Sequence, residues 1–86
     1  MENNYILYPS TIKALAEEIK RACNDYNARR INNDEIKEVI NWYAENQADK
    51  LFAAEEINPT ISKIIGKKRV NLINILLESP QKHGGK

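Results

Sequence analysis

The 86-residue sequence has one cysteine, one histidine and three glycines, and each scarcity excludes a class of chemistry. The single cysteine, Cys23, allows no disulfide within the chain, which fits a reducing compartment. The histidine, His83, lies in the polar stretch after Pro80, so neither a catalytic triad nor a histidine-based metal site is expected around it. The glycines form no phosphate-binding loop of the P-loop type. We therefore expect no enzymatic activity, no metal site and no cofactor.

Long apolar runs are also missing. No run approaches the roughly 20 residues that a membrane-spanning helix needs. The first ten residues, MENNYILYPS, have neither a basic start nor a long apolar stretch, so no signal peptide is expected. These absences predict a cytoplasmic protein without a membrane partner.

The net charge is near zero, at +1, but the charges are unevenly distributed. Residues 1–56 hold seven lysines and arginines against eleven acidic residues, a net −4, whereas residues 57–86 hold six against one, a net +5. This asymmetry is typical of a basic binding face on an acidic body. The alternative is that the charges only solvate opposite sides of a helical bundle.

An amphipathic helix is predicted over residues 11–29, with Ser10 or Thr11 as its N-cap. Its apolar residues recur at steps of three and four, which places them on one buried stripe. The stripe consists of Ile12, Leu15, Ala16, Ile19, Ala22, Cys23 and Tyr26. On this stripe Cys23 is interpreted as a small buried hydrophobic residue rather than a nucleophile.

A second helix has the clearest start in the chain. Asn32 is a good N-cap, and Glu35 lies three residues later, where it can complete a capping box. The helix is expected to end within residues 45–50. Its predicted buried stripe consists of Ile36, Val39, Ile40 and Tyr43.

The rest of the chain predicts an all-α fold, a small bundle of three to four helices with an extended N-terminal arm. Residues 1–8 form the arm, either an apolar flap on the helices or an edge strand that pairs with a second copy. Residues 9–79 form the helical domain, with a short helical turn within residues 51–57, and residues 80–86 a disordered tail. No strand is expected outside the arm. Ile19, Ile40 and Leu72 are predicted to be buried.

Gly66 divides the last apolar region, which starts at the predicted cap Asn58 with Pro59 in the first helical position. Either one long helix runs through the glycine at a cost of about 1 kcal/mol relative to alanine, or a short helix ends there in a left-handed cap and a second helix crosses it. The second geometry resembles a helix-turn-helix. The pattern rests on Ile61, Ser62, Ile65 and Gly66 before the turn and on Leu72 and Ile75 after it. Lys67 departs from it, because an apolar residue is usual there.

Under the helix-turn-helix interpretation, the basic run after Gly66 is a candidate DNA-binding site. Lys67 and Lys68 would contact phosphates, because cations are unfavourable at a helix N-terminus unless an anion compensates them. Arg69, Asn71 and Asn74 would reach base edges, since arginine reads guanine and asparagine reads adenine. The alternative is a solvated basic patch that pairs with acidic residues of the preceding helices, such as Glu35, Glu38 or Glu45.

Three segments, TIKALAEEI, WYAENQADKLF and NPTISKIIGKKRVNLI, resemble a family of short clostridial and related Firmicute proteins. The resemblance covers residues 8–77. It implies a small cytoplasmic bacterial protein carried on a phage or plasmid. It implies no catalytic or binding residue.

Two function classes follow from these patterns. The first is a non-enzymatic accessory or regulatory protein that binds double-stranded DNA through the segment after Gly66. The second is a helical protein–protein interaction module or inhibitor, encoded by a mobile element, that binds its partner through acidic helices. Either can act as a monomer or a homodimer. A crossed helix pair with Lys67–Arg69 exposed at one pole and without acidic neighbours favours the first, and one long unbroken helix favours the second.

Overall fold

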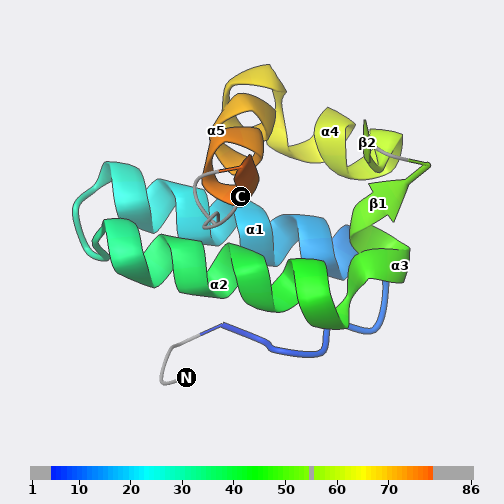
Figure 1. Cartoon of the computed structure of the whole chain (residues 1–86), viewed down its shortest axis with the longest axis horizontal. Coiled ribbons are helices and arrows are strands. Elements are labelled where there is room, and N and C mark those ends of the chain that lie inside the picture. Colours follow the sequence, from blue (N-terminus) through cyan, green and yellow to red (C-terminus); the bar gives the residue numbers. More distant parts are fainter. Residues whose placement is uncertain (1–4, 55, 79–86) are drawn as a thin grey trace.

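The computed structural model describes residues 5–54 and 56–78 (Figure 1). This part of the chain is mostly helical, with one small antiparallel hairpin. The helices are α1 (Ile12–Asn27), α2 (Asn33–Asn46), α3 (Ala48–Leu51), α4 (Pro59–Ile65) and α5 (Lys67–Glu78), and the strands are β1 (Phe52–Ala53) and β2 (Glu56–Ile57). The predicted tail, residues 80–86, lies outside the described residues.

Local capping fixes the starts of α1 and α2, as predicted. The Ala14 N–H donates to the Thr11 hydroxyl oxygen at 3.0 Å, so Thr11 is the N-cap of α1. At α2, Asn32 and Glu35 each accept the other's backbone N–H at 2.8 Å, which completes the capping box. These bonds satisfy N–H groups that have no partner inside the helix.

The end of α1 comes two residues earlier than predicted. Arg29 has a φ of 64°, in the left-handed region, and the chain leaves the helix there. The Arg30 N–H then donates to the Asp25 carbonyl at 2.8 Å, which satisfies a carbonyl of the last turn. The predicted end of α2 is confirmed, because that helix stops at Asn46.

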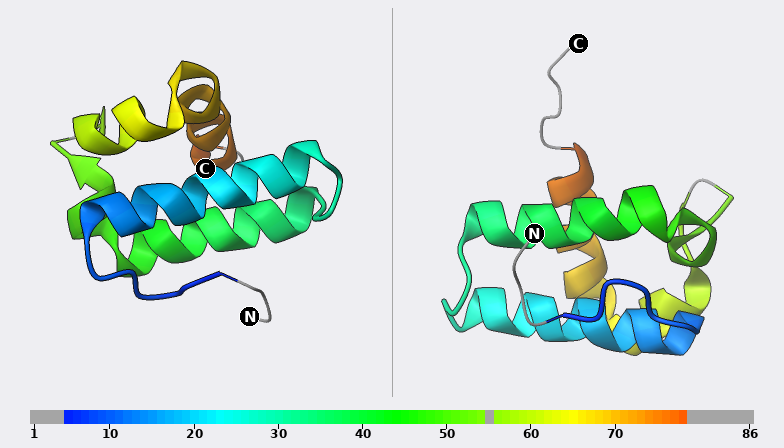
Figure 2. Two further views of the ribbon diagram at one scale, coloured as in Figure 1. Left: turned by 180° about the vertical axis from the view of Figure 1, so that it is seen from behind. Right: turned by 90° about the horizontal axis from the view of Figure 1, so that it is seen from below.

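The helices form two layers with the N-terminal arm on the far side. Figure 1 shows α1 and α2 as an antiparallel pair, with α4 and α5 above them and the arm, residues 5–8, below. Figure 2 shows α5 running across the α1–α2 pair instead of along it. The α1–α2 pair is therefore covered on both faces.

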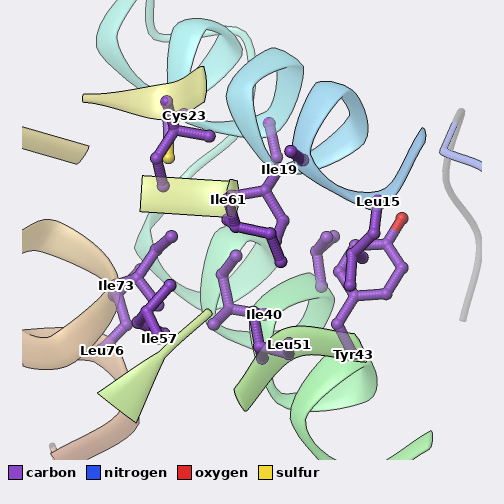
Figure 3. Packing of buried hydrophobic residues seen from close by; sticks show 14 of the residues in the cluster. Leu15, Ile19, Cys23, Ile40, Tyr43, Leu51, Ile57, Ile61, Ile73 and Leu76 are labelled. Carbon is purple, nitrogen blue, oxygen red and sulfur yellow. The ribbon is translucent and has the colours of Figure 1, made fainter. Parts of the chain in front are cut away.

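The core lies between α1, α2 and α4, with α5 closing one side (Figure 3). Ile19 and Ile40 are buried, as predicted. Leu72 is only partly buried, so that prediction is wrong: α5 buries Ile73 and Leu76 instead. Cys23 is fully buried, as its place on the apolar stripe indicated, and burial raises the pKa of its thiol to about 11.

The hairpin at residues 52–57 contradicts the prediction that no strand lies outside the arm. Phe52 pairs with Ile57, and Ala53 pairs with Glu56. The connecting Ala54 has a φ of 60°, a conformation that glycine and asparagine usually supply in such turns. The sequence therefore lacks the usual turn signal here. The helical turn predicted within residues 51–57 is therefore also wrong: the short helix α3 precedes this segment, and β1 begins where α3 ends.

Side chains of α1 and α2 hold the arm in place through its backbone. The Ile6 N–H donates to Glu18 at 3.1 Å, and the Tyr43 hydroxyl donates to the Ile6 carbonyl at 2.5 Å. The Trp42 indole N–H donates to the Leu7 carbonyl at 3.0 Å. The described arm residues form no strand. They take the flap arrangement, because side chains supply partners that a neighbouring strand would otherwise supply.

Tyr5 anchors the tip of this arm. Its ring is buried, its hydroxyl donates to Asp25 at 2.6 Å, and the Arg21 guanidinium lies 5.0 Å from the ring centre. The hydrogen bond from Tyr5, helped by Arg30, holds the pKa of the Asp25 carboxyl below its ordinary value. Attachment of the arm is therefore coupled to an ionised carboxylate.

Truncating a core isoleucine should destabilise the protein far more than truncating an exposed one. Ile40 is 1% exposed and Ile75 is 63% exposed. Ile40→Ala should lower the free energy of unfolding by about 2–5 kcal/mol, because it leaves a cavity. Ile75→Ala, the matched control, should change it by less than about 0.5 kcal/mol. Chemical denaturation followed by circular dichroism measures both, and equal losses would contradict the packing of α2.

The Tyr5–Asp25 hydrogen bond should make stability depend on acid pH. Folding lowers the pKa of Asp25. The stability that Asp25 contributes is therefore fully present above the ordinary aspartate pKa of about 4. It is lost as the pH falls through the lower pKa of the folded protein. Tyr5→Phe should bring the pKa of Asp25 closer to its ordinary value and flatten this acid dependence.

The fluorescence of Trp42, which contacts the arm, reports the transition in an acid titration. Tyr26→Phe is the control, because the Tyr26 hydroxyl donates to the neutral amide oxygen of Asn33 at 2.9 Å. An unchanged titration in Tyr5→Phe would mean that the hydroxyl does not set the ionisation of Asp25.

Candidate nucleic-acid interface

Gly66 breaks the last apolar region into two helices, which was one of the two geometries left open by the sequence. α4 starts as predicted, with the Asn58 side chain accepting the Thr60 N–H at 2.8 Å and Pro59 in the first position. Gly66 then donates its N–H to Ser62 at 2.9 Å and accepts the Val70 N–H at 3.0 Å. One residue thus ends α4 and begins α5.

The backbone of Gly66 differs from the expected left-handed cap. Its φ of 91° is positive, but its ψ of 161° is extended instead of helical. This region is almost restricted to glycine, since a side chain strains the backbone there. The residue type therefore permits a change of helix direction within a single position.

The one-residue turn separates this geometry from the helix-turn-helix that the sequence resembles. Ile61 and Ile65 are buried before the turn, as the pattern requires, but Ile75 after it is exposed. A helix-turn-helix uses a turn of about three to four residues, whereas α5 starts directly at Lys67. The shorter turn changes the rotational phase of the second helix, so Ile73 and Leu76 take the buried positions expected of Leu72 and Ile75.

Arg69 ties the start of α5 to both neighbouring helices. Its guanidinium donates to the Ile65 carbonyl at 2.9 Å and to the Asn24 side-chain oxygen at 2.7 Å. The first bond satisfies a carbonyl at the end of α4, and the second reaches across to α1. The guanidinium that the sequence placed at a base edge is thus bound within the protein, where it fixes the position of α5.

The other four predicted site residues lie together on the outer side of α5. Lys67, Lys68, Asn71 and Asn74 are all exposed, as is Ile75. Their spacing of three and four residues places them in one row along the helix. We call these five residues, Lys67, Lys68, Asn71, Asn74 and Ile75, the α5 stripe.

The two lysines of the α5 stripe are not neutralised by the acidic helices. Within residues 5–54 and 56–78, neither Lys67 nor Lys68 forms an ion pair, so the alternative pairing with Glu35, Glu38 or Glu45 is absent. α5 instead begins with two exposed cations at the positive end of its helix dipole. Such a helix start is electrostatically suited to an anion.

A shallow hollow of about 510 Å³ extends this basic surface from α5 onto α4 and β2. Lys63, exposed on α4, lies at it together with Lys67. One acidic residue, Glu56, also lines it. Lys63 was not among the predicted site residues, because the break at Gly66 interrupts the helical periodicity that relates residues four positions apart.

The described residues lack both metal-ligand clusters and membrane-spanning helices. They contain no group of three or more histidine, cysteine and acidic side chains arranged to hold a metal ion. None of the helices described here combines the length and apolar character needed to cross a bilayer.

The chain belongs to the family designated CLB_0814_fam, described as a conserved hypothetical protein, whose model matches residues 6–78. The family is named after a clostridial locus, which agrees with the clostridial resemblance of the sequence. No curated protein and no solved structure matches the chain.

Replacing Gly66 should show how strongly the break depends on glycine. A Cβ at this position would meet no atom within 4 Å, so steric overlap is not the cost. Backbone strain alone should make Gly66→Ala less stable by about 1–3 kcal/mol. Chemical denaturation measures the loss. Lys68→Ala, an exposed neighbour, should stay within about 0.5 kcal/mol of wild type, and a Gly66→Ala protein of wild-type stability would contradict the backbone conformation described.

Proposed function

We propose that this protein is a non-enzymatic accessory or regulatory protein that binds double-stranded DNA through the α5 stripe. One observation carries the proposal: two lysines without ion pairs among the described residues, and two exposed asparagines, lie in one row on a helix. The crossed arrangement of α4 and α5 supports it further, because a crossed helix pair, and not one long helix, is the geometry expected of this function class (Figure 2).

In this proposal, Lys67 and Lys68 contact phosphates. Their positive charges are unfavourable beside the positive end of the α5 dipole, and a phosphate removes that repulsion. The first backbone N–H groups of α5 also lack partners inside the helix, which suits an anion. Neutralising each phosphate releases condensed counterions, so binding is strongest at low salt.

Asn71 and Asn74 are proposed to contact base edges. An asparagine amide can form two hydrogen bonds with adenine in the major groove, and an apolar side chain such as Ile75 can contact a thymine methyl group. Arg69 takes a different role from the one its residue type indicated. In the proposal it positions α5 through Ile65 and Asn24 instead of reading a base.

The proposed setting is the cytoplasm of a bacterium, with the gene carried on a phage or plasmid. The clostridial locus after which the family is named supports a bacterial host, and the phage or plasmid setting is what the resemblance of the sequence implies. In that setting, duplex DNA is directly accessible to a protein of this size.

Salt dependence of DNA binding should identify the phosphate contacts. In an anisotropy titration of a duplex pool at several salt concentrations, the logarithm of the affinity should fall with the logarithm of salt by about 0.9 per neutralised phosphate. Lys67→Ala and Lys68→Ala should each flatten that slope by about one unit and weaken binding to all sequences alike. Lys13→Ala removes an exposed lysine of α1 and should leave the slope unchanged.

Asn71→Ala and Asn74→Ala should affect sequence preference instead. Either loss should cost about 1–3 kcal/mol at one base pair where the amide makes a bidentate contact. A folded protein without salt-dependent binding to the duplex pool would contradict the whole proposal. That result would favour the interaction-module alternative, in which reversing the charge of Glu38 or Glu45 abolishes capture of a protein partner.

A further inference from the structure

Three large hydrophobic side chains of the described residues are strongly exposed, and they lie on two opposite faces of the molecule. Ile6 and Tyr8, on the arm, are 54% and 64% exposed, and Ile75, on α5, is 63% exposed. The arm and α5 lie on opposite sides of the α1–α2 pair (Figures 1 and 2). Each face therefore exposes at least one large hydrophobic side chain to solvent.

Two acidic residues line a hollow on the face below the α1–α2 pair. The Tyr8 ring packs edge-on against Trp42, with ring centres 5.6 Å apart, and a hollow of about 420 Å³ adjoins Trp42. The charged residues that line this hollow are Glu38 and Glu45. We call the group Ile6, Tyr8, Glu38, Trp42 and Glu45 the arm face.

The arm face is held in a defined shape. The indole N–H of Trp42 donates to the Leu7 carbonyl, and the Tyr43 hydroxyl donates to the Ile6 carbonyl, so the arm cannot leave α2 without breaking both bonds. Glu38 and Glu45 lie on either side of Trp42 along α2, one turn away in each direction. An apolar surface is thus flanked by two carboxylates that are exposed.

The α5 stripe also combines an exposed apolar side chain with two charged residues, but its charges are positive. Its apolar residue is Ile75, and its charged residues, Lys67 and Lys68, lie seven or eight positions earlier on α5, about 10–12 Å along the helix axis. Glu38 and Glu45 are seven positions apart on α2, a separation of about 10 Å.

We infer that the arm face of one molecule binds the α5 stripe of a second copy of this chain. Both complementary surfaces belong to the same chain, so no other partner is needed to match charge with charge. Like faces of two copies would repel each other, which disfavours a two-fold dimer through either face. The contact is therefore head-to-tail, and such contacts build rings when they close and filaments when they do not.

This inference uses the α5 stripe but not its binding to DNA, so association measured without DNA tests it separately. Sedimentation at low salt, over protein concentrations up to roughly 1 mM, should give an average mass that rises with concentration and falls when salt is added. Glu38→Lys/Glu45→Lys and Lys67→Glu/Lys68→Glu should each weaken association by about tenfold or more, since like charges then face each other.

An equimolar mixture of the two charge-reversed proteins should associate again, because the intact α5 stripe of one meets the intact arm face of the other. Ile75→Ser should also weaken association without changing any charge. Glu17→Lys and Lys13→Glu reverse exposed charges of α1 that belong to neither face, and both should associate like wild type. All the substituted side chains are exposed, and circular dichroism verifies folding.

Two results would overturn the inference. One is a wild-type protein that stays monomeric over the whole concentration range. The other is a mixture of the charge-reversed proteins that fails to associate although the wild type does, since that outcome assigns the contact to other surfaces or to a single face used twice.

Discussion

The packing of α4 on α1 is the contact on which the rest of the structure depends. α4 has seven residues, too few to be stable as an isolated helix in water. It is stabilised because Ile61 and Ile65 are fully or almost fully buried against the apolar stripe of α1, as Figure 3 shows for Ile61. Once α4 is fixed, Gly66 determines where α5 begins, and the hydrogen bonds of Arg69 to Ile65 and Asn24 determine the direction of α5. The position of the α5 stripe therefore follows from the packing of α4 on α1.

The parts of the fold that could be predicted from the sequence are those determined by neighbouring residues. Thr11, Asn32 and Asn58 cap their helices through bonds that span two or three positions, and the buried stripes of α1 and α2 follow directly from helical periodicity. Four of the five candidate site residues lie on one exposed row for the same reason. The break itself was one of two predicted geometries, since only glycine signals it.

The predictions that failed depend on contacts between distant residues or on a single backbone angle. Arg69 binds Asn24, 45 positions away, and no local pattern relates the two. The burial of Ile73 in place of Leu72 follows from the one-residue turn, which shifts every later position of α5. The hairpin was missed because Ala54 adopts a positive φ that its residue type disfavours, and because strands of two residues show no alternation.

The basic residues at the start of α5 make the charge distribution of this fold uneven. Three consecutive cations begin the helix, where its dipole disfavours them. Arg69 is compensated inside the protein, by a carbonyl oxygen and an amide oxygen, and this arrangement also fixes the helix. Lys67 and Lys68 have no such compensation among the described residues, although acidic side chains are plentiful on α1 and α2. The fold keeps those acids on other surfaces, including the arm face. Exposed ion pairs add little to stability, so the fold loses little by keeping the two signs apart, and this separation supports the proposal that both surfaces bind partners.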